Sequence, residues 1–175
     1  LYKSEYQDLC RGLSLYSRGY LEGIIAAQSQ INGGYIIDEM LTADTLRLVN
    51  SDFLKASKGR FSVTGRELSY TLAKETTGRQ RYTALALLSD RCNVNVYSND
   101  TDGRLEKASF CGYVDYYDKM PAVFRSSKIN LNISLCTIQT GIPLRVLDIM
   151  ACGGFVLTNM QPELMEYFIP GEDVA

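Results

Sequence analysis

A single carboxylate stands inside an apolar helical pattern between Gly141 and Asn159. Asp148 is that carboxylate, and Arg145 precedes it by about one helical turn. An ionised carboxylate accepts hydrogen bonds from two vicinal hydroxyls, and a guanidinium fork matches the oxygens of a phosphate. The two side chains are chemically suited to a ligand that carries both hydroxyls and phosphate. The alternative is an ordinary helix Asp, solvated or paired with Arg145.

The elements that position Asp148 follow from the residues around it. The pattern predicts a helix over Ile142–Ala151 and a buried strand over Phe155–Thr158. Gly153 and Gly154 lie between them and predict a tight helix-to-strand corner that needs a positive φ.

Strands and helices alternate through residues 66–175. Further strands are predicted at Leu68–Ala73, Val94–Tyr97, Phe110–Gly112 and Ile129–Ile133. Further helices are predicted at Thr77–Ser89, Tyr116–Ser126 and Pro162–Phe168. Such alternation predicts an α/β fold with a parallel sheet covered on both faces. Ligands of these sheets bind beyond the carboxyl ends of the strands, so the loops after the strands matter most. These loops are Ser98–Gly103, Gly112–Tyr117, Ser134–Gly141 and Thr158–Pro162.

Residues 1–65 have a helical pattern instead. Apolar residues from Leu9 to Ile31 recur at spacings of three and four, which predicts one helix that ends at Asn32-Gly33-Gly34. A second helix follows with Ile37 inward, and Asp44 is the predicted cap of a third.

Composition excludes several classes of protein. The chain has 175 residues and a net charge of −2, which disfavours a nucleic-acid partner. No apolar run approaches the length of a membrane span. The five cysteines form no Cys-x-x-Cys pair, so we expect reduced thiols in a cytoplasmic protein. The absence of histidine removes Ser-His-Asp systems and His-ligated metals. Residue 1 is not Met, and we expect a piece of a longer protein.

Several stretches resemble the carboxyl-terminal domain of bacterial CgeB-like proteins, which are group 1 glycosyltransferases of the GT-B fold related to spore-maturation proteins. The stretches are GYVDYYDKMP at residues 112–121, FRSSKINLNI at residues 124–133, and GIPLR, Asp148 and GGF within residues 141–155. The resemblance extends to YLEGIIAAQ at residues 20–28 and to Arg81.

The resemblance implies that residues 66–175 are a Rossmann-like domain, the donor-binding half of a two-domain enzyme. Residues 1–65 would be a helical segment that packs on this domain or links to it. The acceptor-binding half would lie upstream. The donor would be a nucleoside-diphosphate sugar, with UDP and GDP not distinguished, and a hexosyl group would pass to an unknown acceptor. No tightly bound cofactor or metal is expected.

The resemblance also implies roles for individual residues. Related retaining enzymes have a Glu at the position of Asp148, where it accepts hydrogen bonds from the ribose hydroxyls. Arg145 and the backbone N–H groups of Thr140, Gly141 and Ile142 would hold the diphosphate at the helix start. The alternative for Thr140, Gly141 and Ile142 is a plain loop-to-helix cap. The remaining predicted binding residues are Gly112 and Tyr113 beside the nucleobase, and Lys74 at the phosphates. For Tyr113, packing in the core or on the surface is the alternative. Lys74, Arg79 and Arg81 follow the first predicted strand, and a plain surface role is the alternative for each.

One departure from the family pattern concerns catalysis. Retaining members often carry a second Glu eight positions before the first, and that position is Thr140 here. The catalytic residues therefore stay unassigned. The alternative function is a degenerate, non-catalytic domain that serves as a binding or scaffolding module in spore or cell-surface assembly. A dinucleotide-dependent enzyme is disfavoured because no Gly-x-Gly-x-x-Gly precedes a helix.

Overall fold

The computed structural model describes residues 5–175, so the first four residues of the predicted helical segment lie outside it. The chain forms two compact units. The helical unit holds the described residues up to Arg79 together with Leu135–Thr137. The α/β unit holds residues 80–134 and 138–175.

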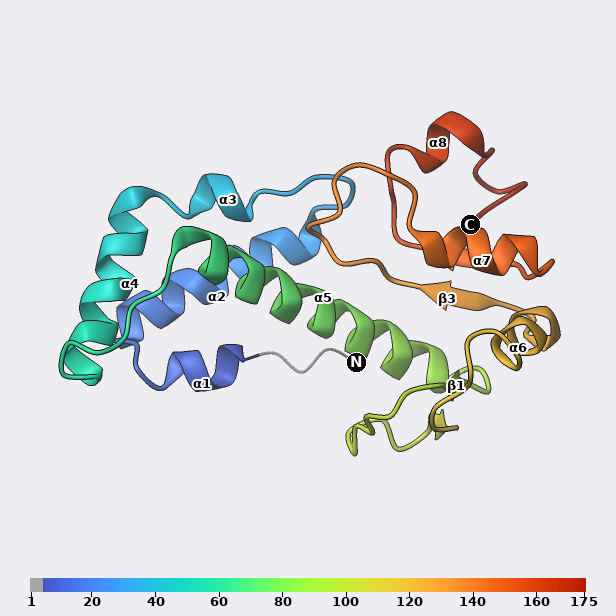
Figure 1. The fold of residues 1–175 in the computed structure, drawn as a ribbon, viewed down its shortest axis with the longest axis horizontal. Coiled ribbons are helices and arrows are strands. Elements are labelled where there is room, and N and C mark those ends of the chain that lie inside the picture. The colour runs from blue at the N-terminus through green and yellow to red at the C-terminus, as the bar shows by residue number, and fades with distance from the viewer. Residues whose placement is uncertain (1–4) are drawn as a thin grey trace. The chain divides into compact units, whose positions relative to one another are not determined.

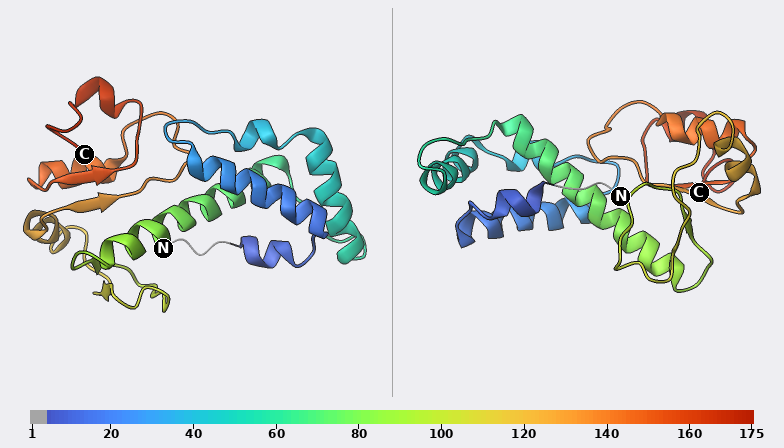
Figure 2. Two further views of the ribbon diagram at one scale, coloured as in Figure 1. Left: turned by 180° about the vertical axis from the view of Figure 1, so that it is seen from behind. Right: turned by 60° about the horizontal axis from the view of Figure 1, so that its bottom comes forward.

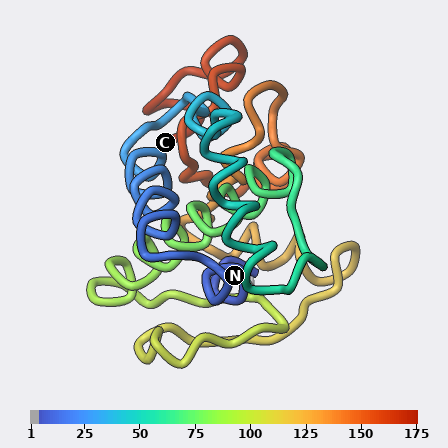
Figure 3. Tube along the Cα trace, turned by 90° about the vertical axis from the view of Figure 1, so that its left-hand side faces the viewer, coloured from blue at the N-terminus to red at the C-terminus, as the bar shows by residue number. Residues whose placement is uncertain are grey.

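Helices build the helical unit. They are α1 (Tyr6–Cys10), α2 (Leu15–Gln30), α3 (Ile37–Met40), α4 (Ala43–Ala56) and the first part of α5 (Gly65–Ser89). The ribbon in Figure 1 and the trace in Figure 3 show α2 and α4 as separate rods of this unit. Its core is an apolar cluster that all five helices supply: Tyr6, Leu21, Ile24, Ile25, Ile37, Val49, Phe53, Leu68, Leu72 and Ala73.

The prediction of a single helix from Leu9 to Ile31 is wrong, because a non-helical segment separates α1 from α2. Ser14 begins α2 in an extended conformation, and its hydroxyl accepts a hydrogen bond from the backbone N–H of Ser17 at 3.3 Å. An N-terminal cap of this kind fixes a new helix start. The apolar spacing continued across the break and hid it.

The cap predicted at Asp44 is also wrong. The side chain of Thr42 caps α4 by accepting from the N–H of Thr45 at 3.2 Å. Asp44 lies in the first turn, where it pairs with Arg47. A carboxylate in the first turn is still favourable, because it faces the positive end of the helix dipole.

The strand predicted at Leu68–Ala73 is instead part of α5. Thr64 and Glu67 form a reciprocal capping box, in which each side chain accepts from the other residue's N–H, at 3.2 and 2.8 Å. The buried residues then recur with the helical period: Leu68, Ser69, Leu72, Ala73, Thr76 and Thr77. The helix therefore starts about twelve residues before the predicted Thr77.

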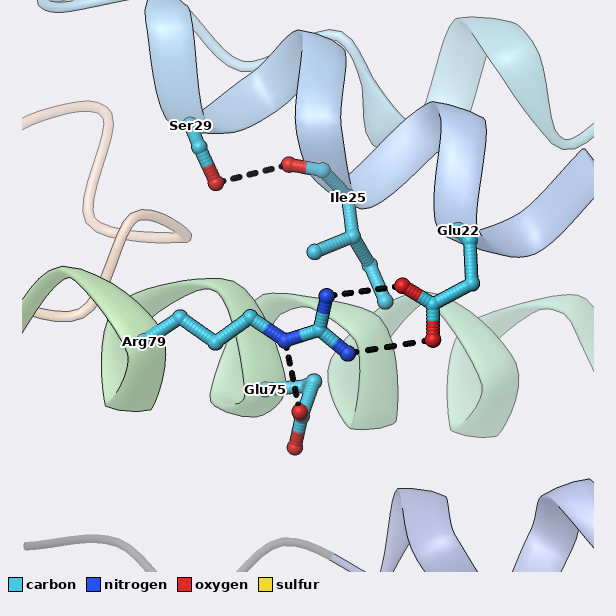
Figure 4. Close-up of polar contacts among 5 residues, drawn as sticks. All are labelled: Glu22, Ile25, Ser29, Glu75 and Arg79. Atoms are coloured by element: carbon cyan, nitrogen blue, oxygen red, sulfur yellow. Dashed lines mark hydrogen bonds and ion pairs between the residues drawn. The ribbon is translucent and has the colours of Figure 1, made fainter. Parts of the chain in front are cut away.

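An ion cluster joins α2 to α5 within the helical unit (Figure 4). Arg79 donates to both carboxylate oxygens of Glu22, at 2.7 and 3.1 Å, and to Glu75 at 2.8 Å. The hydrogen bonds from Arg79 are the main reason that the pKa of the Glu22 carboxyl is lowered. The same pairing raises the pKa of Arg79. A two-pronged contact of this kind fixes how the two helices face each other.

The α/β unit contains the last part of α5 and two short parallel sheets. The strands are β1 (Asn95–Val96), β2 (Ser109–Phe110), β3 (Asn130–Asn132) and β4 (Val156–Thr158), paired as β1–β2 and β3–β4. The other helices are α6 (Met120–Ser126), α7 (Leu144–Ala151) and α8 (Leu164–Tyr167). Figure 2 shows this unit from two further sides, where α7 lies beside β3 and β4. The core cluster draws on these elements and consists of Phe124, Val146, Ile149, Val156, Leu164 and Val174.

The predicted mixed α/β class is confirmed in this coarse form, with parallel pairing and with β3, α7 and β4 in the predicted order. In the part of the chain that the structure describes, the strands form two separate pairs and are shorter than predicted. The helix expected from Tyr116 starts only at Met120. The carboxylate of Asp115 accepts from the N–H groups of Tyr117 and Asp118, at 2.9 and 2.8 Å, and so holds a turn there.

The Gly-Gly corner after α7 is confirmed, and its two glycines act differently. Gly153 has a φ of +74°, the left-handed conformation that usually ends a helix. Gly154 does not have a positive φ, but it packs closely against α6 and β3. A Cβ added to Gly154 would come 2.8 Å from both the Phe124 carbonyl oxygen and Asn130 Nδ2. The corner thus lets α7 pack against β3 and α6.

Among residues 5–175, no helix has both the length and the apolar character needed to cross a membrane.

Replacing Glu22 with Gln should cost about 1 kcal/mol of unfolding free energy at pH 7, because the pair with Arg79 is partly exposed. A lowered pKa stabilises the fold above the carboxyl's unfolded value of about 4.3. This stabilisation is lost as the pH falls through the lower folded value. Chemical unfolding from pH 7 to pH 3 should therefore show the two proteins converging. Glu39→Gln, at an exposed position of α3, is the matched control. A pH-independent difference would contradict the ion-pair account.

Replacing Gly154 with Ala should destabilise the α/β unit by about 1–3 kcal/mol, the usual range for overpacking, because backbone must move to admit the methyl group. Gly103→Ala is the control, since its Cβ meets nothing within 4 Å. Thermal unfolding compares the two variants, and equal melting temperatures would show that the close approach at Gly154 carries no cost.

Candidate functional site

The start of α7 is fixed by the residues just before it. Gly141 has a φ of +88°, a backbone conformation that residues with a side chain rarely adopt. It turns the chain after Thr140. Pro143 precedes the first helical residue in a non-helical conformation, and a proline at this position disfavours the helical conformation for the residue before it, Ile142. No side chain caps α7. Helix α7 therefore presents an uncapped N-terminus, whose first N–H groups and partial positive charge suit an anion.

Asp148 lies on α7 and receives a hydrogen bond from another part of the α/β unit. The hydroxyl of Tyr116 donates to Asp148 Oδ2 at 2.7 Å, across 32 residues of sequence. This bond to the carboxylate is the main reason that the pKa of Tyr116 is raised. Within the described residues no ion pair joins Asp148 to Arg145, so the surface pair considered from sequence does not form. Asp148 is only partly buried and keeps capacity for further donors.

Arg145 lies one turn earlier on α7 and packs on aromatic rings. Its guanidinium carbon is 5.4 Å from the ring centroid of Tyr116 and 5.5 Å from that of Phe124, distances typical of cation–π contacts. The nitrogen Nη1 is buried, and no acceptor for it lies among the described residues. A buried donor without a partner is costly, so an anionic ligand that reached this nitrogen would offset that cost.

The remaining predicted residues of this region lie on the loops beside α7 and α6. Gly112 follows β2 and has a φ of +73°, while the side chain of Tyr113 is 70% exposed. Thr140 is exposed at the end of the loop after β3, and Ile142 packs on the apolar core. The structure thus brings Asp148 and Arg145 together through Tyr116, and leaves Tyr113 and Thr140 facing solvent.

The basic residues of α5 lie in a different setting from the predicted one. The strand that should have preceded them is helix, so they do not follow a strand end. Lys74 belongs to the helical unit, where its Nζ is 5.6 Å from the ring centroid of Tyr70. Arg79 is committed to Glu22 and Glu75. Arg81 belongs to the α/β unit and donates through Nε to the carbonyl of Ile133 at 2.9 Å.

The loop after β3 contains a segment, Leu135–Thr137, that is anchored to α5 within the helical unit. The N–H of Cys136 donates to the hydroxyl oxygen of Thr77 at 3.1 Å, and Cys136 Sγ contacts the Ala73 carbonyl at 3.6 Å. Burial raises the pKa of the Cys136 thiol. This anchor fixes the middle of the loop that leads into Gly141.

The family model described as glycosyl transferase-like matches residues 53–175. The chain belongs to this glycosyl transferase-like family. All eight predicted binding residues lie inside the matched range. Membership supports a glycosyl-transfer function and a transferase. Searches of curated proteins and of solved structures give no match.

Tyr116 is the member of the site that sequence reasoning missed. The pattern assigned it to the first turn of a helix and favoured Tyr113 as the aromatic residue. The nearest signal is Asp115, whose type and position fit a turn that would expose the tyrosines after it. Nothing in the local sequence pairs Tyr116 with a residue 32 positions away.

The described residues contain no group of three or more His, Cys, Asp or Glu side chains that could hold a metal ion. Helix α7 instead offers a carboxylate acceptor and a guanidinium, and the rings of Tyr116 and Phe124 lie against that guanidinium.

Replacing the buried Thr77 with Val should destabilise the fold by about 1 kcal/mol, because the partly buried N–H of Cys136 loses its acceptor while the side chain keeps its shape. Thr77→Ser keeps the hydroxyl and should therefore lower the free energy of unfolding much less. Thermal unfolding of the two variants checks the anchor. A valine variant as stable as the serine variant would contradict it.

Proposed function

We propose that the α/β unit binds the nucleoside-diphosphate sugar donor of a glycosyltransferase. The observation that carries this proposal is the group of polar side chains on α7. The Asp148 carboxylate and the Arg145 guanidinium, which has one nitrogen without a partner, lie one turn apart on this helix. The N-terminus of α7 has no side-chain cap. Family membership supports the reaction class.

Each group has a role that matches its chemistry. Asp148 accepts hydrogen bonds from the vicinal hydroxyls of the ribose, which are donors to a carboxylate. Arg145 and the N–H groups of Thr140, Gly141 and Ile142 hold the diphosphate, because a helix start and a guanidinium both favour phosphate oxygens. Gly112 and Tyr113 flank the base. Lys74, expected from the sequence at the phosphates, belongs to the helical unit and is not part of this proposed site.

The finer family assignment is part of the same proposal. The chain is a CgeB-like donor-binding half of a GT-B enzyme, with its acceptor-binding half upstream. The full protein transfers a hexosyl group to an acceptor in a bacterial cytoplasm. The donor is held without a tightly bound metal or cofactor, since helix start and guanidinium neutralise the diphosphate.

One observation favours a second function. Thr140 is an exposed hydroxyl at the position where retaining relatives carry a carboxylate, and the chain has no histidine. A degenerate domain that binds a sugar nucleotide without transferring it would share the α7 site. Release or transfer of sugar from a radiolabelled UDP- or GDP-hexose by the full-length protein separates the two functions, because the binding module would show neither.

The donor site predicts that UDP or GDP binds the 175-residue chain and that Asp148→Asn weakens this binding about tenfold or more, the loss of a hydrogen bond to a charged group. Calorimetric titration at millimolar nucleotide measures both affinities. Asp118→Asn is the matched control, since this exposed carboxylate lies near Tyr116 in sequence and the hydrogen bond of Asp118 to Asp115 uses its backbone N–H.

Binding that is absent in the unchanged chain for both nucleotides would overturn the donor site. Binding that survives Asp148→Asn unchanged would overturn the role of Asp148.

A further inference from the structure

We infer that Tyr116 is a positioning residue of the donor site, which holds the Asp148 carboxylate in the orientation that selects a ribose. This inference rests on the proposed function and adds to it a residue and a specificity. The bond from the Tyr116 hydroxyl to Asp148 Oδ2, at 2.7 Å, is the contact that carries it.

The contact uses only part of the carboxylate. An ionised carboxylate has two oxygens and about four acceptor positions, and Tyr116 occupies one position on Oδ2. Among the described residues no other side chain donates to Asp148. The bond therefore restricts rotation of the carboxylate while leaving Oδ1 for a ligand hydroxyl. To bind two vicinal hydroxyls at once, the carboxylate must offer free acceptor positions and must also point toward both hydroxyls.

Tyr116 is itself held in place, so it can transmit a fixed orientation. The guanidinium of Arg145 lies over its ring, at 5.4 Å from the centroid. The ring of Tyr117 meets it edge-on, with centroids 5.1 Å apart and an interplanar angle of 86°. Asp115 fixes the turn beneath by accepting from the N–H groups of Tyr117 and Asp118. Ring contacts and backbone turn together leave the hydroxyl little freedom.

A fixed acceptor favours a ligand by reducing the ordering that binding requires. In the absence of the tyrosine hydroxyl, the partly exposed Asp148 side chain would sample several rotamers, and only some would meet both ribose hydroxyls. The loss should fall on the hydroxyl contacts and leave the phosphate contacts of Arg145 intact. Selectivity for ribose over deoxyribose should therefore fall more than affinity for the diphosphate.

The experiment compares binding of UDP and 2′-deoxy-UDP, or of GDP and 2′-deoxy-GDP if GDP binds better, to the unchanged chain and to Tyr116→Phe. Phenylalanine keeps the ring contacts to Arg145 and Tyr117 and removes only the hydroxyl. The unchanged chain should prefer the ribonucleotide about tenfold, and the variant should lose most of this preference. Tyr117→Phe is the control, because that hydroxyl makes no hydrogen bond within the described residues and its side chain is 84% exposed.

Two results would overturn the inference. A Tyr116→Phe variant with an unchanged ribose preference would show that the hydroxyl does not orient Asp148. A variant that binds more tightly and discriminates more would show that Tyr116 competes with the ribose. Thermal unfolding of Tyr116→Phe checks that the compared proteins are folded.

Failure of the inference differs from failure of the proposed function. If the unchanged chain binds neither ribonucleotide, the donor site itself is wrong. If it binds and prefers ribose while Tyr116→Phe does the same, only the role of Tyr116 is wrong.

Discussion

The hydrogen bond between Tyr116 and Asp148 is the contact on which the arrangement of the site depends. It joins the loop after β2 to helix α7, two segments that share no backbone pairing. Arg145 packs on the same tyrosine ring, so one aromatic side chain holds the orientation of both charged groups. The other features of the site serve to place α7 where this contact can form. Gly141 and Pro143 set its beginning, and the Gly153–Gly154 corner returns the chain to β4.

Much of the fold was predictable because the local patterns are strong. The strand–helix–strand order around Asp148 follows from an apolar helix between a proline and two glycines, and the structure has it. The prediction of a strand at residues 68–73 is wrong because a short apolar run does not distinguish a strand from a helix. The capping box of Thr64 and Glu67 starts a helix here, and these two residues lie before the apolar run. The break before Ser14 was missed for a similar reason, since the apolar spacing continues across it.

The candidate site was predictable in part. Asp148 stands out because a carboxylate is unusual in an apolar helix, and Arg145 follows from the helical spacing. Tyr116 does not stand out, because its partner is distant in sequence and several tyrosines are its neighbours. The pairing of Arg79 with Glu22 likewise spans 57 residues and removes Arg79 from the set of free cations. Contacts of this range depend on packing, which sequence periodicity does not encode.

The central claim is that α7 and the loops beside it bind a nucleoside diphosphate. The most direct measurement is a titration of the isotopically labelled chain with UDP and with GDP, followed by the backbone amide resonances in NMR spectra. The account predicts that one nucleotide shifts the backbone amide resonances of the α7 start and of Tyr116 and Asp148 along a common binding curve. The residues of the α7 start are Thr140, Gly141, Ile142, Leu144 and Arg145. Shifts confined to other regions, or none at millimolar nucleotide, would contradict it.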